Sequence, residues 1–310
     1  MTNLSQTDVS TVATEASPHG AASSDTAAAA PAETVEMEIR KADRRVSLWG
    51  YPATYLLMGI NFAVFAAMFR YGPVLGLIHQ HDWAGILTAS FTADTIRHFG
   101  GTDSTLIQQG QWWRLITGTF VHVTILHIVL NMWCLWNLGL FGEPLLGKRG
   151  LLAVYLLTGT AGMILSYGWS IYHREDGLVA GASGAVFGLA GILIVLLSNR
   201  KLSLPWNELR GLRRQVIFFA VANLVIGMTP NMLTMASASQ LQMVHLDPGM
   251  LPHIDNTAHI GGFLSGLALG LPLFPRMTSG RSSYRARQSL TFAFGALLLC
   301  LIWYALSKFV

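Results

Sequence analysis

The chain has 310 residues, of which 52% are hydrophobic and only 12% are charged, and its mean hydropathy is +0.46. Soluble globular domains carry about 25% charged residues, so this composition excludes a soluble enzyme, a disordered regulator and a nucleic-acid-binding protein. The net charge of +4 is therefore interpreted as a signal of membrane topology and not as a nucleic-acid-binding surface. The composition predicts an all-α polytopic membrane protein that is surrounded by a lipid bilayer.

Residues 1–48 form the first predicted region. They are rich in Ala, Ser, Thr and Glu, and they hold seven of the sixteen acidic residues. Such a segment cannot bury enough apolar surface to offset its ordering entropy, so a disordered tail is predicted. It lacks the apolar core of a cleavable signal peptide and is too acidic for a mitochondrial transit peptide. The first apolar helix is therefore expected to act as an uncleaved targeting signal.

Seven apolar segments follow, each close to the roughly 20 residues that a membrane span requires. Two connections between them are unusually long, at 71–123 and 231–256, and loops of that length are often functional. The predicted helices cover 51–70, 124–146, 150–171, 179–198, 215–231, 257–275 and 288–308.

The distribution of Lys and Arg predicts the orientation of these helices. With the N-terminal tail in the cytoplasm, fifteen of these residues lie inside and five lie outside. Cytoplasmic loops carry the excess of positive charge in membrane proteins. The sequence therefore predicts a cytoplasmic N-terminus, an exterior C-terminus, and both long loops on the exterior.

Four polar side chains lie inside predicted spans. Placing such groups in a bilayer costs free energy, so they are usually functional. His127 and Asn131 share one face of the second helix, with Thr124 as its expected N-cap. Ser183 lies in Gly181-Ala182-Ser183-Gly184 at the start of the fourth helix, and His259 begins the sixth. All three helices are predicted to enter from the exterior. The four groups are therefore expected to converge within roughly 3 to 10 Å of that face.

Acyl transfer by a serine nucleophile fits this arrangement. A serine hydroxyl reacts as a nucleophile when a base takes its proton. His259 is the only histidine in the last three predicted spans, so it is the candidate base. His127, the Asn131 amide and the Ser183 N–H are candidate donors to an oxyanion. Phe187, one turn after the serine, is placed to stack on the imidazole. Close packing of the fourth and sixth helices is expected from small residues, namely Gly184 and Gly188 on one and Gly262, Gly266 and Gly270 on the other.

Each of these features also has an ordinary structural explanation. Membrane helices are rich in Gly, Ala and Ser, so a GxSG motif alone is weak. A histidine near a helix end is usually an interfacial residue, and an asparagine often only joins helices. The functional interpretation depends on four polar groups at one depth on three converging helices.

These residues resemble the motifs of the rhomboid family of intramembrane serine proteases. The resemblance covers about 51–275 and predicts a rhomboid-like six-helix core plus a C-terminal seventh helix. It implies three regions: a cytoplasmic tail at 1–48, a catalytic membrane domain at 49–275, and a basic loop with the seventh helix at 276–310. The matching motifs are Trp113-Arg114 in the first external loop, His122, His127 and Asn131, then Gly181-Ala182-Ser183-Gly184, and Ala258-His259 with Gly262 and Gly266.

The resemblance implies a role for each matching residue. Ser183 would be the nucleophile and His259 the general base and then the acid, while His127 and Asn131 would assist the oxyanion. Arg114 would satisfy loop carbonyls beside Trp113. The 231–256 loop would cap the site, and the fifth helix would form a lateral gate for substrate.

Three positions depart from the family pattern or stay open. Phe187 stands where the family usually has Tyr, which keeps the ring but not the hydroxyl. Asp255 precedes His259 by four residues, and it either orients the imidazole or faces solvent. Acidic residues in loops more often face solvent. Glu143 is expected to cap the loop beside Pro144.

The implied activity is cleavage of single-pass transmembrane substrates, with no metal and no organic cofactor. The expected location is a bacterial plasma membrane, with a eukaryotic secretory membrane as the alternative. Cys134 and Cys300 both lie in apolar runs, so no disulfide and no metal site is predicted. One alternative is a non-proteolytic rhomboid-like protein that binds transmembrane helices. Another is a small-solute transporter, but no internal repeat of the kind common in transporters is visible.

Overall fold

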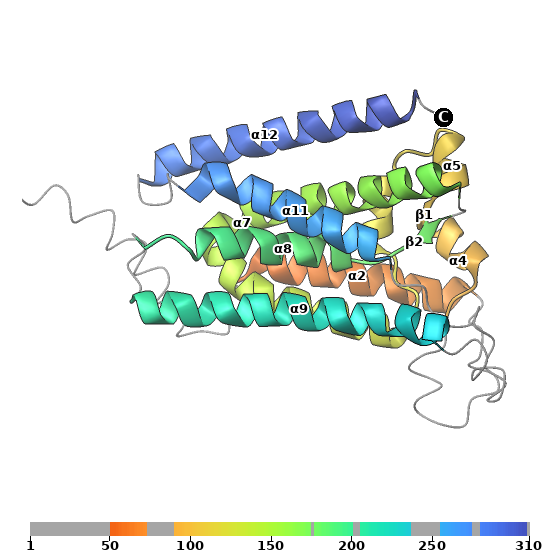
Figure 1. The fold of residues 1–310 in the computed structure, drawn as a ribbon, viewed down its shortest axis with the longest axis horizontal. Coiled ribbons are helices and arrows are strands. Elements are labelled where there is room, and N and C mark those ends of the chain that lie inside the picture. The colour runs from red at the N-terminus through yellow and green to blue at the C-terminus, as the bar shows by residue number, and fades with distance from the viewer. Residues whose placement is uncertain are drawn as a thin grey trace, which may run out of the picture.

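The computed structural model describes residues 50–72, 90–174, 177–200, 205–236, 255–274 and 280–308. The described residues are almost entirely helical, as the sequence predicts, and the long helices run side by side in a bundle (Figure 1). The predicted tail at 1–48 and most of the predicted cap, 237–254, lie outside the described residues. The long helices are α2 (Pro52–Tyr71), α7 (Ile125–His173), α8 (Ser183–Leu196), α9 (Trp206–Ala236), α11 (Asn256–Leu273) and α12 (Arg281–Leu306).

Helix α7 contains two of the predicted spans. It extends over 49 residues but is interrupted at Gly147, whose φ of 72° and ψ of 162° are not helical. A positive φ is readily available to glycine and strained for other residues, which explains a turn at this position. Pro144 lies just before the break and also disfavours a continuous helix.

Several predicted boundaries are wrong by a few residues. The fourth helix begins at Ser183, not at 179, because residues 178–179 pair as a strand. Helix α9 is longer than the predicted 215–231 and begins at Trp206. By length and apolarity, three described helices suffice to cross a membrane: Pro52–Tyr71, Ile125–His173 and Ser282–Leu306. The number of crossings stays a prediction.

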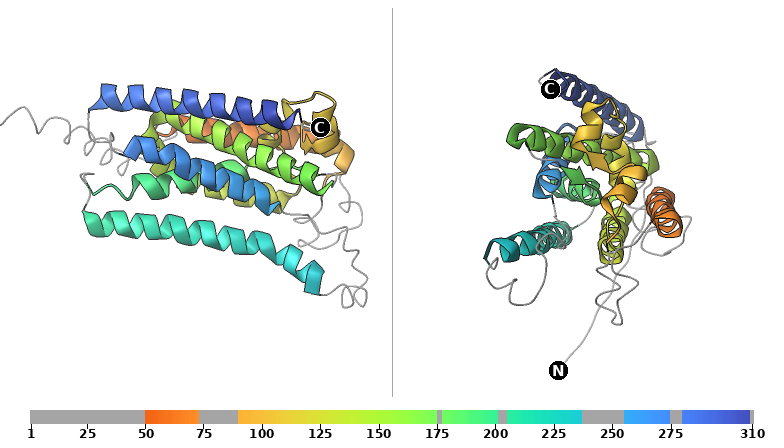
Figure 2. Two further views of the ribbon diagram at one scale, coloured as in Figure 1. Left: turned by 45° about the horizontal axis from the view of Figure 1, so that its top comes forward. Right: turned by 90° about the vertical axis from the view of Figure 1, so that its right-hand side faces the viewer.

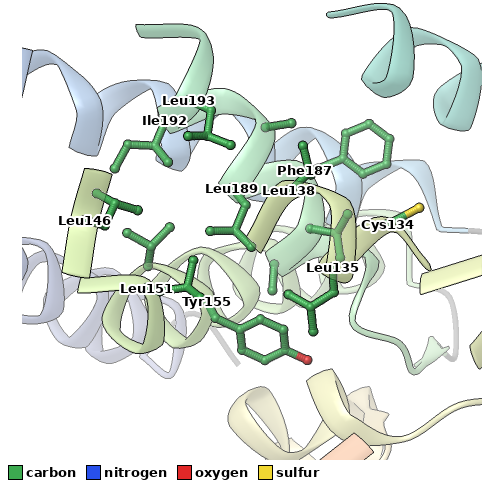
Figure 3. Close-up of a cluster of buried hydrophobic side chains, with 14 of the residues drawn as sticks. Cys134, Leu135, Leu138, Leu146, Leu151, Tyr155, Phe187, Leu189, Ile192 and Leu193 are labelled. Carbon is green, nitrogen blue, oxygen red and sulfur yellow. The ribbon is translucent and has the colours of Figure 1, made fainter. Parts of the chain in front are cut away.

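Helix α8 forms the centre of the bundle. All but three of its fourteen residues are buried, and α7 and α11 pack on it most extensively. The two views in Figure 2 place α2, α9 and α12 toward the periphery. Figure 3 shows the main apolar core, where side chains of α7 and α8 meet; it includes Leu135, Leu151, Tyr155, Leu189 and Leu193.

Glycines set the contact between α8 and α11. A Cβ added to Gly262 would collide with the carbonyl oxygen of Gly184, and one added to Gly266 would collide with that of Gly188. The two backbones therefore touch directly, as small-xxx-small faces allow in membrane helices. This contact fixes the start of α11 against the start of α8.

Two polar side chains attach peripheral helices to α7. The buried Glu143 carboxyl accepts hydrogen bonds from the N–H groups of Ala53 and Thr54 (both 2.9 Å) and from the Thr54 hydroxyl (2.7 Å). It caps α2 rather than the loop beside Pro144, so that expectation is corrected. On the other side, Gln288 of α12 donates to the carbonyl of Leu146 at 2.9 Å, next to the break in α7.

Candidate active site

Ser183 and His259 meet at one end of the bundle. The Ser183 Oγ and the His259 Nε2 are 2.8 Å apart, which is hydrogen-bond distance. His259 is 6% exposed and Ser183 is half-buried. The imidazole is therefore largely removed from solvent, while part of the Ser183 residue stays accessible. This is the geometry in which a histidine can accept the proton of a serine nucleophile.

Local helix geometry places both side chains. Ser183 is the first residue of α8, and His259 lies in the first turn of α11. The preceding Gly181 has φ +138°, a conformation that L side chains rarely adopt. Glycine at this position thus allows the chain to turn sharply from β2 (Leu178–Val179) into α8.

Phe187 stacks on the ring of His259. The ring centroids are 4.6 Å apart and the planes are inclined by 22°. Both side chains are buried, so the contact holds the imidazole in one orientation against α8. Replacement of the family's usual tyrosine by Phe187 leaves this stacking intact.

Asp255 does not contact the imidazole of His259 by a hydrogen bond. It is the N-cap of α11, accepting from the N–H of Thr257 at 2.8 Å and from the hydroxyls of Thr257 and Ser166. The Nδ1 of His259 has no hydrogen-bond partner among the described residues. Among the described residues, no third side chain is hydrogen-bonded to the imidazole, and Asp255 caps the helix instead.

The ring of His127 lies beside the loop that precedes the serine. A Cβ built on Gly181 would lie 2.7 Å from its Cε1 and 2.9 Å from its Nε2. His127 also stacks edge-on against His122, with centroids 5.1 Å apart. The predicted N-cap is present, because the N–H of His127 donates to Thr124 Oγ1 at 3.0 Å.

Asn131 is buried, but its hydrogen bond runs within α7. Its Nδ2 donates to the carbonyl of His127 at 2.9 Å and not to Ser183. Buried His122 instead contacts the serine loop directly, because its Nε2 accepts from the N–H of Ala182 at 3.4 Å. The structure therefore brings His127 and His122 to the serine loop, while the hydrogen bond of Asn131 stays within α7.

The loop of residues 90–123 forms a folded platform at this end of the bundle. It contains α4 (Ala93–His98), α5 (Ser104–Gln108), α6 (Arg114–Thr117), a 3₁₀ turn (Gly118–Phe120) and β1 (Thr102–Asp103), which pairs antiparallel with β2. The N–H of Gly181 donates to the carbonyl of Gly118 at 2.9 Å. The platform is therefore joined to the chain just before Ser183.

Arg114 donates hydrogen bonds to loop carbonyls of this platform, which is the contact that the family resemblance implies. Its Nη1 donates to the carbonyls of Arg97 (2.6 Å) and Gly101 (2.9 Å), and its Nε donates to Gln111 Oε1 (2.8 Å). Buried loop carbonyls need such donors. The neighbouring Trp113 is 46% exposed, so its ring adds little to this network.

Asp103 ties two elements of the platform together. Its Oδ2 accepts from Arg97 Nε at 2.7 Å and its Oδ1 accepts from the N–H of Leu106 at 2.9 Å. Burial acts to raise the pKa of Asp103, but the hydrogen bonds from Arg97 and Leu106 outweigh it and hold the pKa below its ordinary 3.8.

Two contacts of the site have no pattern in the sequence. Ser166 is one of two serines in the apolar second half of α7, 89 residues before its partner Asp255. The link from Ala182 to His122 spans 60 residues. The family resemblance included His122 among the matching residues but gave it no role, and no local signal marks the contact of Ser166 with Asp255.

Comparison with known proteins adds the family. A family model of the rhomboid domain matches residues 109–276. The chain is 35% identical over 188 residues to Rhomboid protease GluP of Bacillus subtilis, covering 59% of this chain and 31% of the relative. It is 31% identical over 193 residues to RHOMBOID-like protein 1 of Arabidopsis thaliana, covering 62% of this chain and 42% of the relative.

A third relative is Rhomboid-like protease 2 of Toxoplasma gondii, which is 28% identical over 180 residues, covering 58% of this chain and 54% of that protein. The matches thus span between about a third and just over half of the length of these curated relatives. The matched family domain includes every candidate site residue, from Trp113 to Gly266.

Proposed function

The chain belongs to the rhomboid family, and we propose that it is an intramembrane serine endopeptidase in which Ser183 and His259 form the catalytic dyad. The observation that carries this proposal is the 2.8 Å contact between Ser183 Oγ and His259 Nε2, reinforced by the stacking of Phe187. Two of the relatives are named proteases, which supports the same reaction class.

The proposed reaction proceeds in two steps. Ser183 Oγ attacks the scissile carbonyl while His259 Nε2 accepts the hydroxyl proton, and His259 then delivers that proton to the leaving amine. A water molecule next loses a proton to His259 and attacks the carbonyl carbon of the acyl-enzyme. The ester bond to Ser183 Oγ then breaks, His259 returns the proton to that oxygen, and the carboxylic acid product is released. No metal or organic cofactor enters either step.

The oxyanion would be held by donors beside the serine loop. The Ser183 N–H and the His127 ring are the donors that the geometry favours, since His127 lies against Gly181. The amide of Asn131, now bonded to the His127 carbonyl, would have to rotate to contribute directly. We therefore propose that Asn131 stabilises the oxyanion less than His127 does.

The proposed substrates are single-pass transmembrane helices. Their peptide bonds are already hydrogen-bonded within the helix, so a segment must unwind locally before Ser183 can reach a carbonyl. The half-buried position of Ser183, at the first residue of α8, supports access near one face of the bilayer. From the Lys and Arg distribution, that face is the exterior one, and a bacterial plasma membrane is the proposed location.

Cleavage of a model single-pass substrate in liposomes tests the proposal. Ser183→Ala and His259→Ala are expected to abolish the product band, whereas Ser265→Ala, a serine on α11 away from the dyad, should leave it in place. Labelling with a fluorophosphonate probe separates a wrong substrate from a missing nucleophile. Equal labelling of wild type and Ser183→Ala would contradict the proposal and favour a non-proteolytic helix-binding protein.

A further inference from the structure

A cluster of arginines surrounds one tryptophan at the end of the bundle opposite Ser183. The guanidinium carbons of Arg200, Arg213 and Arg210 lie 4.6, 5.8 and 6.0 Å from the ring centroid of Trp206. Arg200 follows the C-terminus of α8, and the other three residues belong to the first turns of α9. The sequence thus places three cations around one indole, where a membrane helix meets the aqueous phase.

The charge of this cluster is not balanced within the described residues. The ion pairs found among the described residues join Arg97 to Asp94 and Asp103, and these lie on the platform at the opposite end of the bundle. Glu208 is the single acid of α9, beside Arg210, Arg213 and Arg214. Planar guanidinium groups bind phosphate oxygens through paired hydrogen bonds, so the cluster is suited to a phosphate group.

An apolar cavity adjoins the same arginines. It has a volume of ≈ 300 Å³ and lies between the C-terminal ends of α8 and α11. Arg213 Nη1 donates to Ser198 Oγ at 3.0 Å, and Ser198 is one of the residues that line the cavity. The lining residues are Ile194, Val195, Ser198, Leu271 and Phe274.

We propose that this place binds one anionic phospholipid, with its phosphate among Arg200, Arg210 and Arg213 and part of an acyl chain in the adjoining cavity. The charge of the cluster selects an anionic over a zwitterionic lipid, and the apolar lining selects a lipid over free phosphate. Trp206 would lie at the headgroup level, where indoles concentrate in membrane proteins. The proposal does not depend on the catalytic role of Ser183.

Quenching of Trp206 by brominated lipids tests the binding. The full chain is reconstituted in phosphatidylcholine vesicles that contain a fixed fraction of either dibromo-phosphatidylglycerol or dibromo-phosphatidylcholine. The signal of Trp206 is taken as the difference between wild type and Trp206→Phe. We expect stronger quenching by the brominated phosphatidylglycerol, and an apparent affinity reduced by about tenfold or more in Arg200→Ala/Arg213→Ala, because each cation near the surface contributes strongly.

A matched variant separates a site from general surface charge. Lys148→Ala/Arg149→Ala removes two cations next to the break in α7 and should keep the preference for phosphatidylglycerol. Leu271→Trp, which fills the cavity, should reduce binding while leaving the arginines in place. Equal quenching by the two brominated lipids, or equal losses in the two double variants, would overturn the proposal. Displacement by millimolar inorganic phosphate would show instead that the cluster binds the anion alone.

Discussion

Helices α11 and α9 both pack on α8, but they do so in different ways. Helix α11 touches α8 backbone to backbone, through glycines at which any added Cβ would collide. Among the described side chains of α9, Leu209, Val216 and Ala220 are buried, while Phe218 is 74% exposed. The contact that aligns Ser183 with His259 thus has almost no freedom, whereas the α9 contact can shift without breaking a close fit.

The largest expected effect is at a glycine of the tight interface. Gly262→Val should destabilise the protein by about 3 kcal/mol or more and abolish proteolysis, because its side chain collides with the Gly184 carbonyl. Unfolding in mixed detergent and denaturing micelles measures the stability. Gly211→Ala on α9 is the matched control, since nothing lies within 4 Å of its added Cβ. Equal stability of Gly262→Val and wild type would mean that the two helices are not in backbone contact.

The next effect concerns the cap that holds the start of α11. Asp255→Ala should lower the free energy of unfolding by about 1 to 2 kcal/mol, the usual value for a lost N-cap. Since Asp255 does not contact the imidazole, proteolysis should fall through misplacement of the helix, and Asp255→Asn should restore most of it. A pH–rate profile checks this: an unchanged profile fits a capping role, while a displaced one would make Asp255 a partner of His259.

A similar size of effect is expected where α2 is capped from α7. Glu143→Ala leaves the N–H groups of Ala53 and Thr54 without their acceptor in a buried place, which costs about 1 to 3 kcal/mol. Glu143→Gln retains one acceptor oxygen and should recover part of this loss. Thermal denaturation in detergent measures both variants, and no difference between Ala and Gln would argue against a capping role.

A smaller effect should follow acidification of the platform. The pKa of Asp103 is lower in the folded protein, so its stabilising contribution is complete above the ordinary value and is lost as pH falls through the lowered one. The protection of residues 97–114 against hydrogen exchange, taken relative to the intrinsic rate at each pH, should therefore fall below about pH 4. In Asp103→Asn this change with pH should be absent. Identical acid responses in the two proteins would place the titrating group elsewhere.

The smallest effect is expected on the outer side of α9. Phe218→Ala should change the unfolding free energy by no more than about 0.5 kcal/mol, as is usual for exposed positions. The same micelle titration used for Gly262→Val measures it. A loss above 1 kcal/mol would show that this side of α9 is covered by another part of the protein and would weaken the contrast between the two helices.

Much of the fold and the site could be predicted from the sequence. Apolar segments of the right length gave most of the long helices, and the glycine spacing predicted the close approach of α8 and α11. The residues of the motifs, Ser183, His259, His127 and Phe187, do come together in the structure. Their catalytic roles stay a prediction, because contact alone does not measure reactivity.

Other features could not be predicted because they depend on partners distant in sequence. The start of α8 at Ser183 is set by the pairing of β2 with β1, which competes with helix formation at 178–179. The cap on α2 comes from Glu143, about 90 residues later in the chain. Local patterns contain no information about such long-range hydrogen bonds.

The sequence by itself determined the membrane class, the family and the identity of the polar residues that a bilayer would otherwise exclude. Those follow from composition, periodicity and motif, which are local properties of the chain. The tertiary structure decided what Asp255 and Glu143 hold and which donors border the serine loop. These depend on which backbone groups are left without partners once the helices pack, and that is known only when all the helices are in place.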